Sequence, residues 1–346
     1  MAELRVCIVR LSALGDVCLA VPLVRAIQDQ HPNAHITWII GKPAHALLEE
    51  LSGVRFVVLD KQSHWRGYLK VRNQLRQLEF DVLLGLQASF RAHLLYPFIH
   101  AKRKIGYDRP RQRDLHSLFI RETIPPLHGH LLDGFLLFGK AIGINPTRLH
   151  WDLPISTDDW SWAENALKKR DRWLAINPVA SKRERTWALP RYAQVAIEAA
   201  RRWNCGIALT GGPDPSEMRQ ALNLETQIRQ GGLEPLNLCG KTTPKQLAAV
   251  LGSVQCLLAP DTGPAHIADA MGTPVVGLYA VIGSNLSGPY RSLHRVVDRY
   301  REAVHTILGK NPDEIRWGTR VHNSRAMDLI SCEDVLVQLS KLFDVP

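Results

Sequence analysis

The chain has 346 residues, a mass of 38.9 kDa and a formal net charge of +10. This length exceeds the usual size of one hydrophobic core, so we expect two domains. Apolar residues make up 45% and charged residues 22%, which excludes a disordered, collagen-like or coiled-coil chain. No apolar run approaches the roughly 18 residues that span a bilayer, and Glu3 and Arg5 interrupt the apolar stretch that a signal peptide needs. We therefore expect a soluble, cytoplasmic protein.

The cysteines and the charges restrict the possible functions further. The six cysteines are scattered without a CxxC pair, which indicates free thiols in a reducing compartment. Residues 1–150 hold 20 Lys/Arg against 12 Asp/Glu, so most of the positive charge belongs to the first half. Such a field attracts nucleic acid, an anionic membrane surface or a phosphorylated substrate, and composition does not choose among them.

Strands and helices alternate along the first half of the chain. Short β-rich runs predict strands, and apolar residues at helical spacing predict the helices between them. Alternation of this kind is typical of parallel β-α-β units in an open, doubly wound sheet. We expect strands at 4–10, 35–40, 54–59 and 81–86, and helices at 17–28, 43–51 and 68–78.

Prolines and a strand-poor connection around residues 144–157 interrupt this pattern, and the alternation then restarts. We place a domain junction there, with domains at 1–155 and 156–346. The fold expected is α/β, with two Rossmann-like domains whose parallel sheets face an interdomain cleft. Thr243 and Ser331 are the expected N-caps of two helices. Strands are expected at 173–177, 206–210, 235–239, 255–259 and 275–279, and helices at 158–169, 191–203, 217–229, 244–251, from Pro264, and at 333–343.

The loop after the first strand carries a carboxylate. Open parallel sheets bind ligands beyond the carboxyl ends of their strands. The loop at residues 12–16 lacks the GxGxxG fingerprint, which disfavours a nicotinamide or flavin cofactor, and ends in Asp16. One interpretation makes Asp16 an ordinary acid in the first turn of a helix, stabilised by the helix dipole. The other makes it a general base.

A second loop, at residues 259–266, predicts an anion site. A strand ends there, Gly263 lets the backbone approach a ligand closely, and Pro264 suits the first position of a helix. Free backbone N–H groups would then point at the ligand, with Thr262 and His266 as further donors. The alternative is an ordinary helix start.

Three basic residues follow the strand at 173–177, namely Lys182, Arg183 and Arg185. They could neutralise a leaving phosphate, or they could be a solvated charged loop. No DxD sequence occurs in the chain, which disfavours a divalent ion held by carboxylates; we therefore expect no metal and no cofactor.

Two further basic groups lie in the first half. The stretch 91–121 includes Arg111 and Arg113, and no helix-turn-helix, zinc-finger or RNP-like sequence supports nucleic-acid binding by it. A phosphorylated acceptor is the better interpretation, because the same domain carries Asp16. Lys61, Arg66 and Lys70 offer further anion contacts near the same expected cleft.

Over essentially its whole length the chain resembles glycosyltransferase family 9, the ADP-heptose:lipopolysaccharide heptosyltransferases, which adopt the GT-B fold. The matching segments are RLSALGDVCLAVP at 10–22, FDVLLGLQASFRAHLL at 80–95, INPVAS at 176–181, LTGGPDPSE at 209–217 and APDTGPAHIADAMGTPVVGLY at 259–279. The last is the most specific.

The resemblance implies roles for individual residues. Asp16 would be the catalytic base. The DTGPxH segment, Asp261 to His266, would bind the donor diphosphate, with Ser181, Lys182 and Arg185 beside it. The family usually has a lysine two residues before a Trp-Pro pair; here Arg185 precedes Trp187, which Ala188 follows, so Arg185 and Lys182 share that assignment.

The resemblance also implies a reaction and partners. Heptose would pass from ADP-heptose, with inversion, to the anionic inner core of lipopolysaccharide, either Kdo-lipid A or a heptosylated core. Contact would be peripheral, at the cytoplasmic face of the inner membrane. The acceptor would meet the Lys61, Arg66, Lys70, Arg111 and Arg113 side chains. Two alternatives remain: another GT-B enzyme that uses a different nucleotide sugar, and a basic nucleic-acid-binding protein, which would leave Asp16 and the DTGPAH loop without a role.

Overall fold

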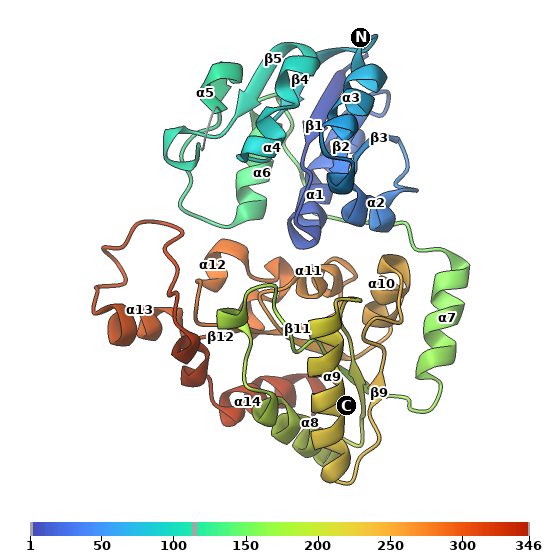
Figure 1. The fold of residues 1–346 in the computed structure, drawn as a ribbon, viewed down its shortest axis with the longest axis vertical. Coiled ribbons are helices and arrows are strands. Elements are labelled where there is room, and N and C mark those ends of the chain that lie inside the picture. The colour runs from blue at the N-terminus through green and yellow to red at the C-terminus, as the bar shows by residue number, and fades with distance from the viewer. Residues whose placement is uncertain (1–2, 113–115, 345–346) are drawn as a thin grey trace. The chain divides into compact units, whose positions relative to one another are not determined.

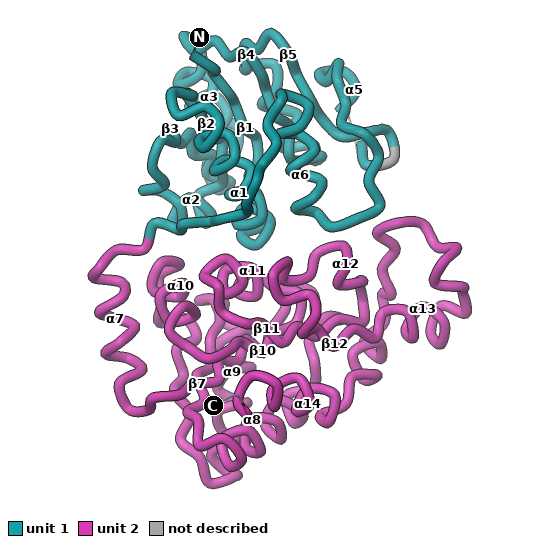
Figure 2. The backbone as a smooth tube through the Cα atoms, turned by 180° about the vertical axis from the view of Figure 1, so that it is seen from behind, with its two compact units in different colours: residues 1–154 teal, residues 155–346 magenta. Residues whose placement is uncertain are grey.

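The computed structural model describes residues 3–112 and 116–344, and these form two compact units. The units comprise residues 1–154 and 155–346 (Figure 2). Each unit is an open parallel sheet between layers of helices (Figure 1). Among the described helices, none is long and apolar enough to cross a membrane.

The first unit contains a six-stranded sheet in the order β3-β2-β1-β4-β5-β6, and every neighbouring pair is parallel. The central strand β1 is buried from Val6 to Val9 and its neighbour β4 from Val82 to Leu84, as parallel strands covered on both faces must be. The strands are β1 (Arg5–Val9), β2 (His35–Gly41), β3 (Val54–Leu59), β4 (Glu79–Leu84), β5 (His100–Gly106) and β6 (Glu122–Thr123).

Helices cover both faces of this sheet. Cys7 and Val9 of β1 face one core, which also contains Val71 and Leu75 of α3 and Ala92 of α4. Helices α1 and α6 pack against each other elsewhere in the same unit. The helices are α1 (Leu14–Gln30), α2 (Lys42–Leu48), α3 (His64–Leu75), α4 (Phe90–His93), α5 (His116–Phe119) and α6 (Leu131–Lys140).

The second unit repeats the strand order of the first. Its sheet runs β9-β8-β7-β10-β11-β12, so in both units the first and fourth strands lie side by side at the centre. All pairs are again parallel. The strands are β7 (Trp173–Ile176), β8 (Gly206–Leu209), β9 (Leu236–Asn237), β10 (Cys256–Pro260), β11 (Val275–Tyr279) and β12 (Val297–Asp298).

The core of the second unit joins its central strands to α8, α9 and α14. Thr243 and Ser331 both form capping boxes, which confirms the caps expected from the sequence. The helices are α7 (Thr157–Leu167), α8 (Leu189–Trp203), α9 (Pro215–Gln230), α10 (Pro244–Gly252), α11 (Gly263–Ala270), α12 (Ser284–Ser287), α13 (Tyr300–Leu308) and α14 (Cys332–Phe343).

The structure departs from the sequence-based expectation at several elements. Helix α3 begins at His64 and ends at Leu75, whereas the prediction was 68–78. Strand β5 and helices α6 and α13 were not predicted. Strand β5 could not be predicted from the pattern because its sequence, HAKRKIG, is mostly polar and basic. In the structure, Asp81 forms an ion pair with Lys102, and Glu122 forms one with Arg103.

Candidate functional site

In both sheets the order in which strands are added reverses between the first and the fourth strand, which makes this place the topological switch point. In the first unit this point lies between β1 and β4, and in the second between β7 and β10. The loops that leave the carboxyl ends of these strands diverge, which is where open α/β sheets bind ligands. Asp16 follows β1, Arg185 follows β7 and Asp261 follows β10. The candidate residues therefore mark the switch point of each sheet.

Asp16 lies in the first turn of α1, at the third helical position. Its Oδ2 atom accepts a hydrogen bond from the backbone N–H of Ala13 at 3.2 Å and forms an ion pair with the Arg10 guanidinium. The Asp16 side chain is 30% exposed, whereas that of Arg10 is 10% exposed. The carboxylate is thus anchored on one side by a buried cation and remains open to a ligand on the other.

The β1–α1 loop is fixed by groups that follow β4. Gln87 Oε1 accepts hydrogen bonds from the backbone N–H groups of Leu11 (2.7 Å) and Ser12 (3.3 Å). Arg10 donates through its other terminal nitrogen to the carbonyl of Leu86 at 2.7 Å, and its guanidinium lies 5.4 Å from the ring centre of Phe135. Arg10 therefore connects both central strands to Asp16, and its position leaves little freedom to the carboxylate.

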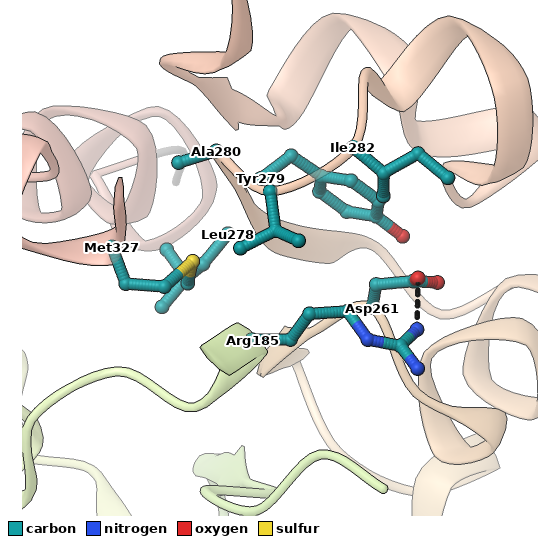
Figure 3. A pocket seen from close by; sticks show the side chains of 8 residues that line it. Arg185, Asp261, Leu278, Tyr279, Ala280, Ile282 and Met327 are labelled. Carbon is teal, nitrogen blue, oxygen red and sulfur yellow. Dashed lines mark hydrogen bonds and ion pairs between the residues drawn. The ribbon is translucent and has the colours of Figure 1, made fainter. Parts of the chain in front are cut away.

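The second switch point joins Arg185 to Asp261. The guanidinium of Arg185 donates to Asp261 Oδ2 at 2.5 Å and to Ser181 Oγ at 3.2 Å. The pair borders a small pocket whose other lining is mostly apolar (Figure 3). Tyr279, at the end of β11, lies in this lining with its ring buried, and burial holds the pKa of its hydroxyl well above the usual range. The pocket is lined by Arg185, Asp261, Leu278, Tyr279, Ala280, Val281, Ile282 and Met327.

Two buried polar atoms at the start of α11 have no hydrogen-bond partner among the described residues. They are Thr262 Oγ1, on the N-cap residue, and His266 Nδ1. Because the first turn of a helix has no preceding carbonyls to bond, the backbone N–H groups of Gly263 and Ala265 are also unpaired within the helix, and Pro264 between them has no N–H. Unsatisfied buried polar groups are costly, and a helix N-terminus favours an anion. The arrangement fits a phosphate group.

Helix α11 is held in place by a carboxylate in its last turn. The Asp269 carboxylate accepts the backbone N–H of Arg291 through both oxygens, at 3.1 and 2.9 Å. Burial of this carboxyl raises the pKa of Asp269, although the Arg291 N–H opposes that shift. We therefore infer that Asp269 fixes the position of α11 rather than binding a ligand.

The other expected ligands differ in their surroundings. Lys182 is exposed and lies before the 3₁₀ turn Arg183–Arg185. Lys61, Arg66 and Lys70 are also exposed, at or near the start of α3. These four side chains are accessible, and the structure gives no geometry that singles out one of them.

The basic stretch 91–121 does not form one charged face. Arg111 is only 11% exposed; it forms an ion pair with Asp108 and donates to the carbonyl of Pro125 at 2.9 Å. Its guanidinium also lies 5.1 Å from the ring centre of Tyr107, whose hydroxyl donates to Leu86, the same carbonyl that Arg10 uses. Arg111 therefore belongs to the network behind Asp16. Arg113 lies outside the described residues.

Arg10, Gln87 and Tyr279 were not assigned roles from the sequence. Each stands at or just beyond the carboxyl end of an apolar strand, in a segment already matched to the family. Arg10 follows β1, Gln87 lies three residues beyond β4, and Tyr279 ends β11. A search for polar residues at these strand ends would have found them. In the part of the chain that the structure describes, no three His, Cys, Asp or Glu side chains are grouped to hold a metal ion.

Two doubly wound parallel sheets of equal strand order are the architecture of GT-B glycosyltransferases. The glycosyltransferase family 9 protein of Veillonella parvula shares this fold with a TM-score of 0.80 at 21% identity, over 99% of this chain and 97% of its own. ADP-heptose lipopolysaccharide heptosyltransferase II of E. coli aligns with a TM-score of 0.75 at 18% identity, over 98% of each chain.

Sequence comparison identifies the family. The model of glycosyltransferase family 9 (heptosyltransferase) matches residues 68–324. The lipopolysaccharide core heptosyltransferase OpsX of Haemophilus influenzae is 37% identical over 337 residues, which cover 97% of this chain and 96% of that protein. This chain belongs to glycosyltransferase family 9.

Proposed function

We propose that this glycosyltransferase moves a heptose from ADP-heptose to the inner core of lipopolysaccharide, with inversion at the anomeric carbon. The acceptor sugar is Kdo on lipid A or a heptose already present on the core. Family membership and the 37% identity to a lipopolysaccharide core heptosyltransferase support this proposal. The geometric observation that carries it is the second switch point, where a guanidinium stands in the same loop cluster as a helix N-terminus with unpartnered polar atoms.

On the donor side, the diphosphate of ADP-heptose occupies the start of α11. The first-turn N–H groups, Thr262 Oγ1 and the ring nitrogen of His266 donate to its oxygens, and Arg185 supplies positive charge. Negative charge on the diphosphate grows as the bond to the sugar breaks, so these donors stabilise the transition state more than the ground state. Asp261 holds the Arg185 side chain toward this loop, with Ser181 as a second anchor. Lys182, which is exposed, adds charge at the rim.

On the acceptor side, Asp16 is the general base. It takes the proton from the acceptor hydroxyl while that oxygen attacks the anomeric carbon from the face opposite the leaving ADP. The bond from carbon to the acceptor oxygen forms as the bond to the diphosphate oxygen breaks. Arg10 and the Ala13 N–H fix the orientation of the carboxylate.

The acceptor is anionic and is anchored in a membrane, and the first unit carries the positive charge that suits it. Lys61, Arg66 and Lys70 are the exposed cations proposed to contact its phosphate or carboxylate groups, and Arg113 completes the set proposed from sequence. Arg111 acts through the network behind Asp16. We place the reaction at the cytoplasmic face of the inner membrane, where the protein is held peripherally.

Replacement of the proposed base tests the mechanism. Asp16→Asn keeps an oxygen that can accept the Ala13 N–H but cannot take a proton, so turnover of ADP-heptose with a truncated core acceptor should fall by about 10²- to 10⁴-fold. The melting temperature and ADP affinity should remain close to those of the wild type. Asp158→Asn, which changes another exposed acid in the first turn of a helix, is the matched control and should keep full turnover. An Asp16→Asn protein that binds ADP and transfers heptose at the wild-type rate would remove Asp16 from the mechanism.

A further inference from the structure

Five of the large apolar side chains that the first unit exposes lie on, or directly after, three of its helices. Trp65 and Leu69 of α3 are 64% and 40% exposed, and they are one helical turn apart. Phe90 begins α4 and Leu94 follows it, with exposed fractions of 51% and 39%. Leu118 of α5 is 70% exposed. Isolated exposed apolar residues are ordinary, but this concentration on neighbouring elements is not.

These helices pack on the same face of the sheet. Val71 of α3, Ala92 of α4 and Ile120, just after α5, belong to one buried core. The Tyr68 hydroxyl donates to the carbonyl of Arg91 at 3.3 Å, which joins α3 directly to α4. Helix α3 is thus apolar on its inner face, through Gly67, Val71 and Leu75, and carries Trp65 and Leu69 outside.

The polar residues between the exposed apolar ones carry charge of a single sign. Helix α3 has Arg66, Lys70 and Arg72, and α4 has Arg91, whereas none of α3, α4 and α5 contains an aspartate or glutamate. The guanidinium of Arg66 lies 5.9 Å from the ring centre of Trp65. The pKa of the carboxyl of Asp60, which precedes α3, is lowered by a backbone hydrogen bond and also by the nearby Lys70 charge, so Lys70 is partly neutralised. A face that combines an exposed tryptophan, aliphatic side chains and an excess of cations is complementary to an anionic lipid bilayer, where aromatic rings occupy the headgroup region.

We propose that the bilayer face, defined as Trp65, Leu69, Phe90 and Leu94 with Arg66, Lys70 and Arg91, docks this protein on an anionic membrane surface. The apolar side chains enter the boundary between headgroups and acyl chains. Arg91 binds lipid phosphates, and Arg66 and Lys70 bind phosphate groups at this surface, those of the lipid-anchored acceptor included. Charge attraction alone falls off within a Debye length of about 8 Å at physiological salt, so the apolar contacts supply the part of the binding that salt does not remove.

The bilayer face adjoins the acceptor side of the site. Phe90 lies three residues beyond Gln87, which holds the Asp16 loop, and Gln87 also donates to Ser89 Oγ at 3.1 Å. Helices α3 and α4 follow β3 and β4, so both start at the carboxyl edge of the sheet, as α1 does. The inference rests on the proposed function to this extent: a lipid-anchored acceptor would present its sugars to Asp16 from the surface on which the protein is docked.

Vesicle binding without any glycolipid tests the docking separately from catalysis. Full-length protein is mixed with vesicles of phosphatidylcholine alone or with about a third phosphatidylglycerol, and the bound fraction is measured by flotation. The wild type should bind the anionic vesicles and bind the neutral ones at least tenfold more weakly. The double variant Trp65→Ser/Phe90→Ser should lose about 10- to 100-fold of the affinity for anionic vesicles, since two partly buried aromatic contacts disappear. The matched control is Met218→Ser/Leu222→Ser on α9, which removes two exposed apolar side chains (44% and 59%) from the second unit and should bind like the wild type.

Two further measurements separate the possible failures. The Trp65→Ser/Phe90→Ser protein should transfer heptose to a deacylated, water-soluble acceptor at the wild-type rate, and lose activity only when the acceptor is embedded in vesicles. Wild-type affinity of the double variant for anionic vesicles, or equal binding of the wild type to neutral ones, would overturn the docking proposal whatever the turnover. A concentration-dependent dimer that the double variant abolishes would also overturn it, because the face would then join two copies. Loss of the soluble reaction in the Asp16 variant would still support the proposed function by itself.

Discussion

At the scale of single residues, each switch point holds its candidate functional group in an ion pair. The group is a carboxylate in the first unit and a guanidinium in the second. In the first unit a buried arginine, Arg10, holds a carboxylate that is about a third exposed. In the second unit the carboxylate of Asp261, at 12% exposure, holds the Arg185 guanidinium, at 18%. Pairing immobilises the functional group before the ligand arrives, which reduces the entropy lost on binding.

Arg10→Lys tests whether Arg10 positions Asp16. Lysine keeps the charge, but all its N–H donors lie on one nitrogen, whereas Arg10 contacts Asp16 and the Leu86 carbonyl through two separate nitrogens of a planar guanidinium. We expect kcat to fall about tenfold or more, with ADP affinity and acceptor KM changed little. Steady-state kinetics and calorimetry with ADP measure both quantities. A fall in ADP affinity with unchanged kcat would contradict a positioning role at Asp16.

Arg185→Ala tests the donor site. Loss of a charge-assisted contact to the diphosphate should weaken ADP binding by about 1.5 to 3 kcal/mol, or roughly 10- to 150-fold. Lys182→Ala, which removes an exposed cation three residues away, should weaken it less. Calorimetric titration with ADP compares the two variants with the wild type. A larger effect at Lys182 would transfer the main phosphate contact to that residue.

At the scale of elements, a buried pair of histidines joins α4 to α5, and one of them also binds the residue that follows β5. His116 Nε2 accepts the backbone N–H of Tyr107 at 3.1 Å, and its Nδ1 lies 2.9 Å from Nε2 of His93. Gly106 leaves the space for this ring, because a Cβ there would lie 2.3 Å from His116 Nε2. Burial, with a smaller contribution from His93, lowers the pKa of His116 to about 4.

This lowered pKa makes stability depend on pH in one direction. Between pH 4 and about 6.5 the unfolded chain binds a proton that folded His116 does not, so the free energy of unfolding should decrease as the pH falls through this range. Above pH 6.5, neutral His116 makes its full contribution to the free energy of unfolding. Uptake of one proton changes that free energy by at most about 1.4 kcal/mol per pH unit. Urea unfolding from pH 4.5 to 7.5 measures it, with His116→Gln as the reference. Equal pH slopes for the two proteins would show that His116 does not cause the dependence.

The elements also show which parts of the fold the sequence could predict. Strands β1, β3, β7 and β11 were predicted within one residue of each end, because they are short, mostly apolar runs bounded by turn-forming residues. The caps at Thr243 and Ser331 could be predicted because each capping box is formed by side chains that are close in the sequence. Strand β5 was not, since its charges are neutralised by Asp81 and Glu122, which are 21 and 19 residues distant from their partners.

At the scale of the whole molecule, the sequence placed Asp16, Thr262 and His266 in loops after strands but could not show that these loops lie at switch points. That property depends on strand order, which arises from pairing between segments distant in the chain. The same is true of Arg10, which donates to the Leu86 carbonyl, and of Gln87, which accepts the Leu11 N–H, because both contacts depend on β1 and β4 being neighbours. In the basic stretch 91–121, Arg103 forms an ion pair with Glu122, which lies 19 residues away in the sequence, so the sequence alone could not show that this charge is neutralised.

Catalysis by the whole enzyme should not require a divalent metal, because the proposed diphosphate site consists of backbone N–H groups, hydroxyl and imidazole groups, and cationic side chains. Turnover measured with excess EDTA should remain within about twofold of the untreated rate. Calcium-saturated EDTA is the control for effects of the chelator itself. Activity that disappears with EDTA and returns on addition of magnesium or manganese would contradict this expectation.

The shared strand order of the two sheets has an evolutionary consequence. Each unit closes its own hydrophobic core, and in each the proposed functional groups lie in the segments that leave the first and fourth strands. Such segments tolerate substitution better than the strands they follow. With the donor and acceptor sites as proposed, one unit can therefore acquire a different nucleotide-sugar preference while the other keeps its acceptor, and the reverse holds as well. A tandem pair of equal scaffolds lets the two proposed specificities diversify separately.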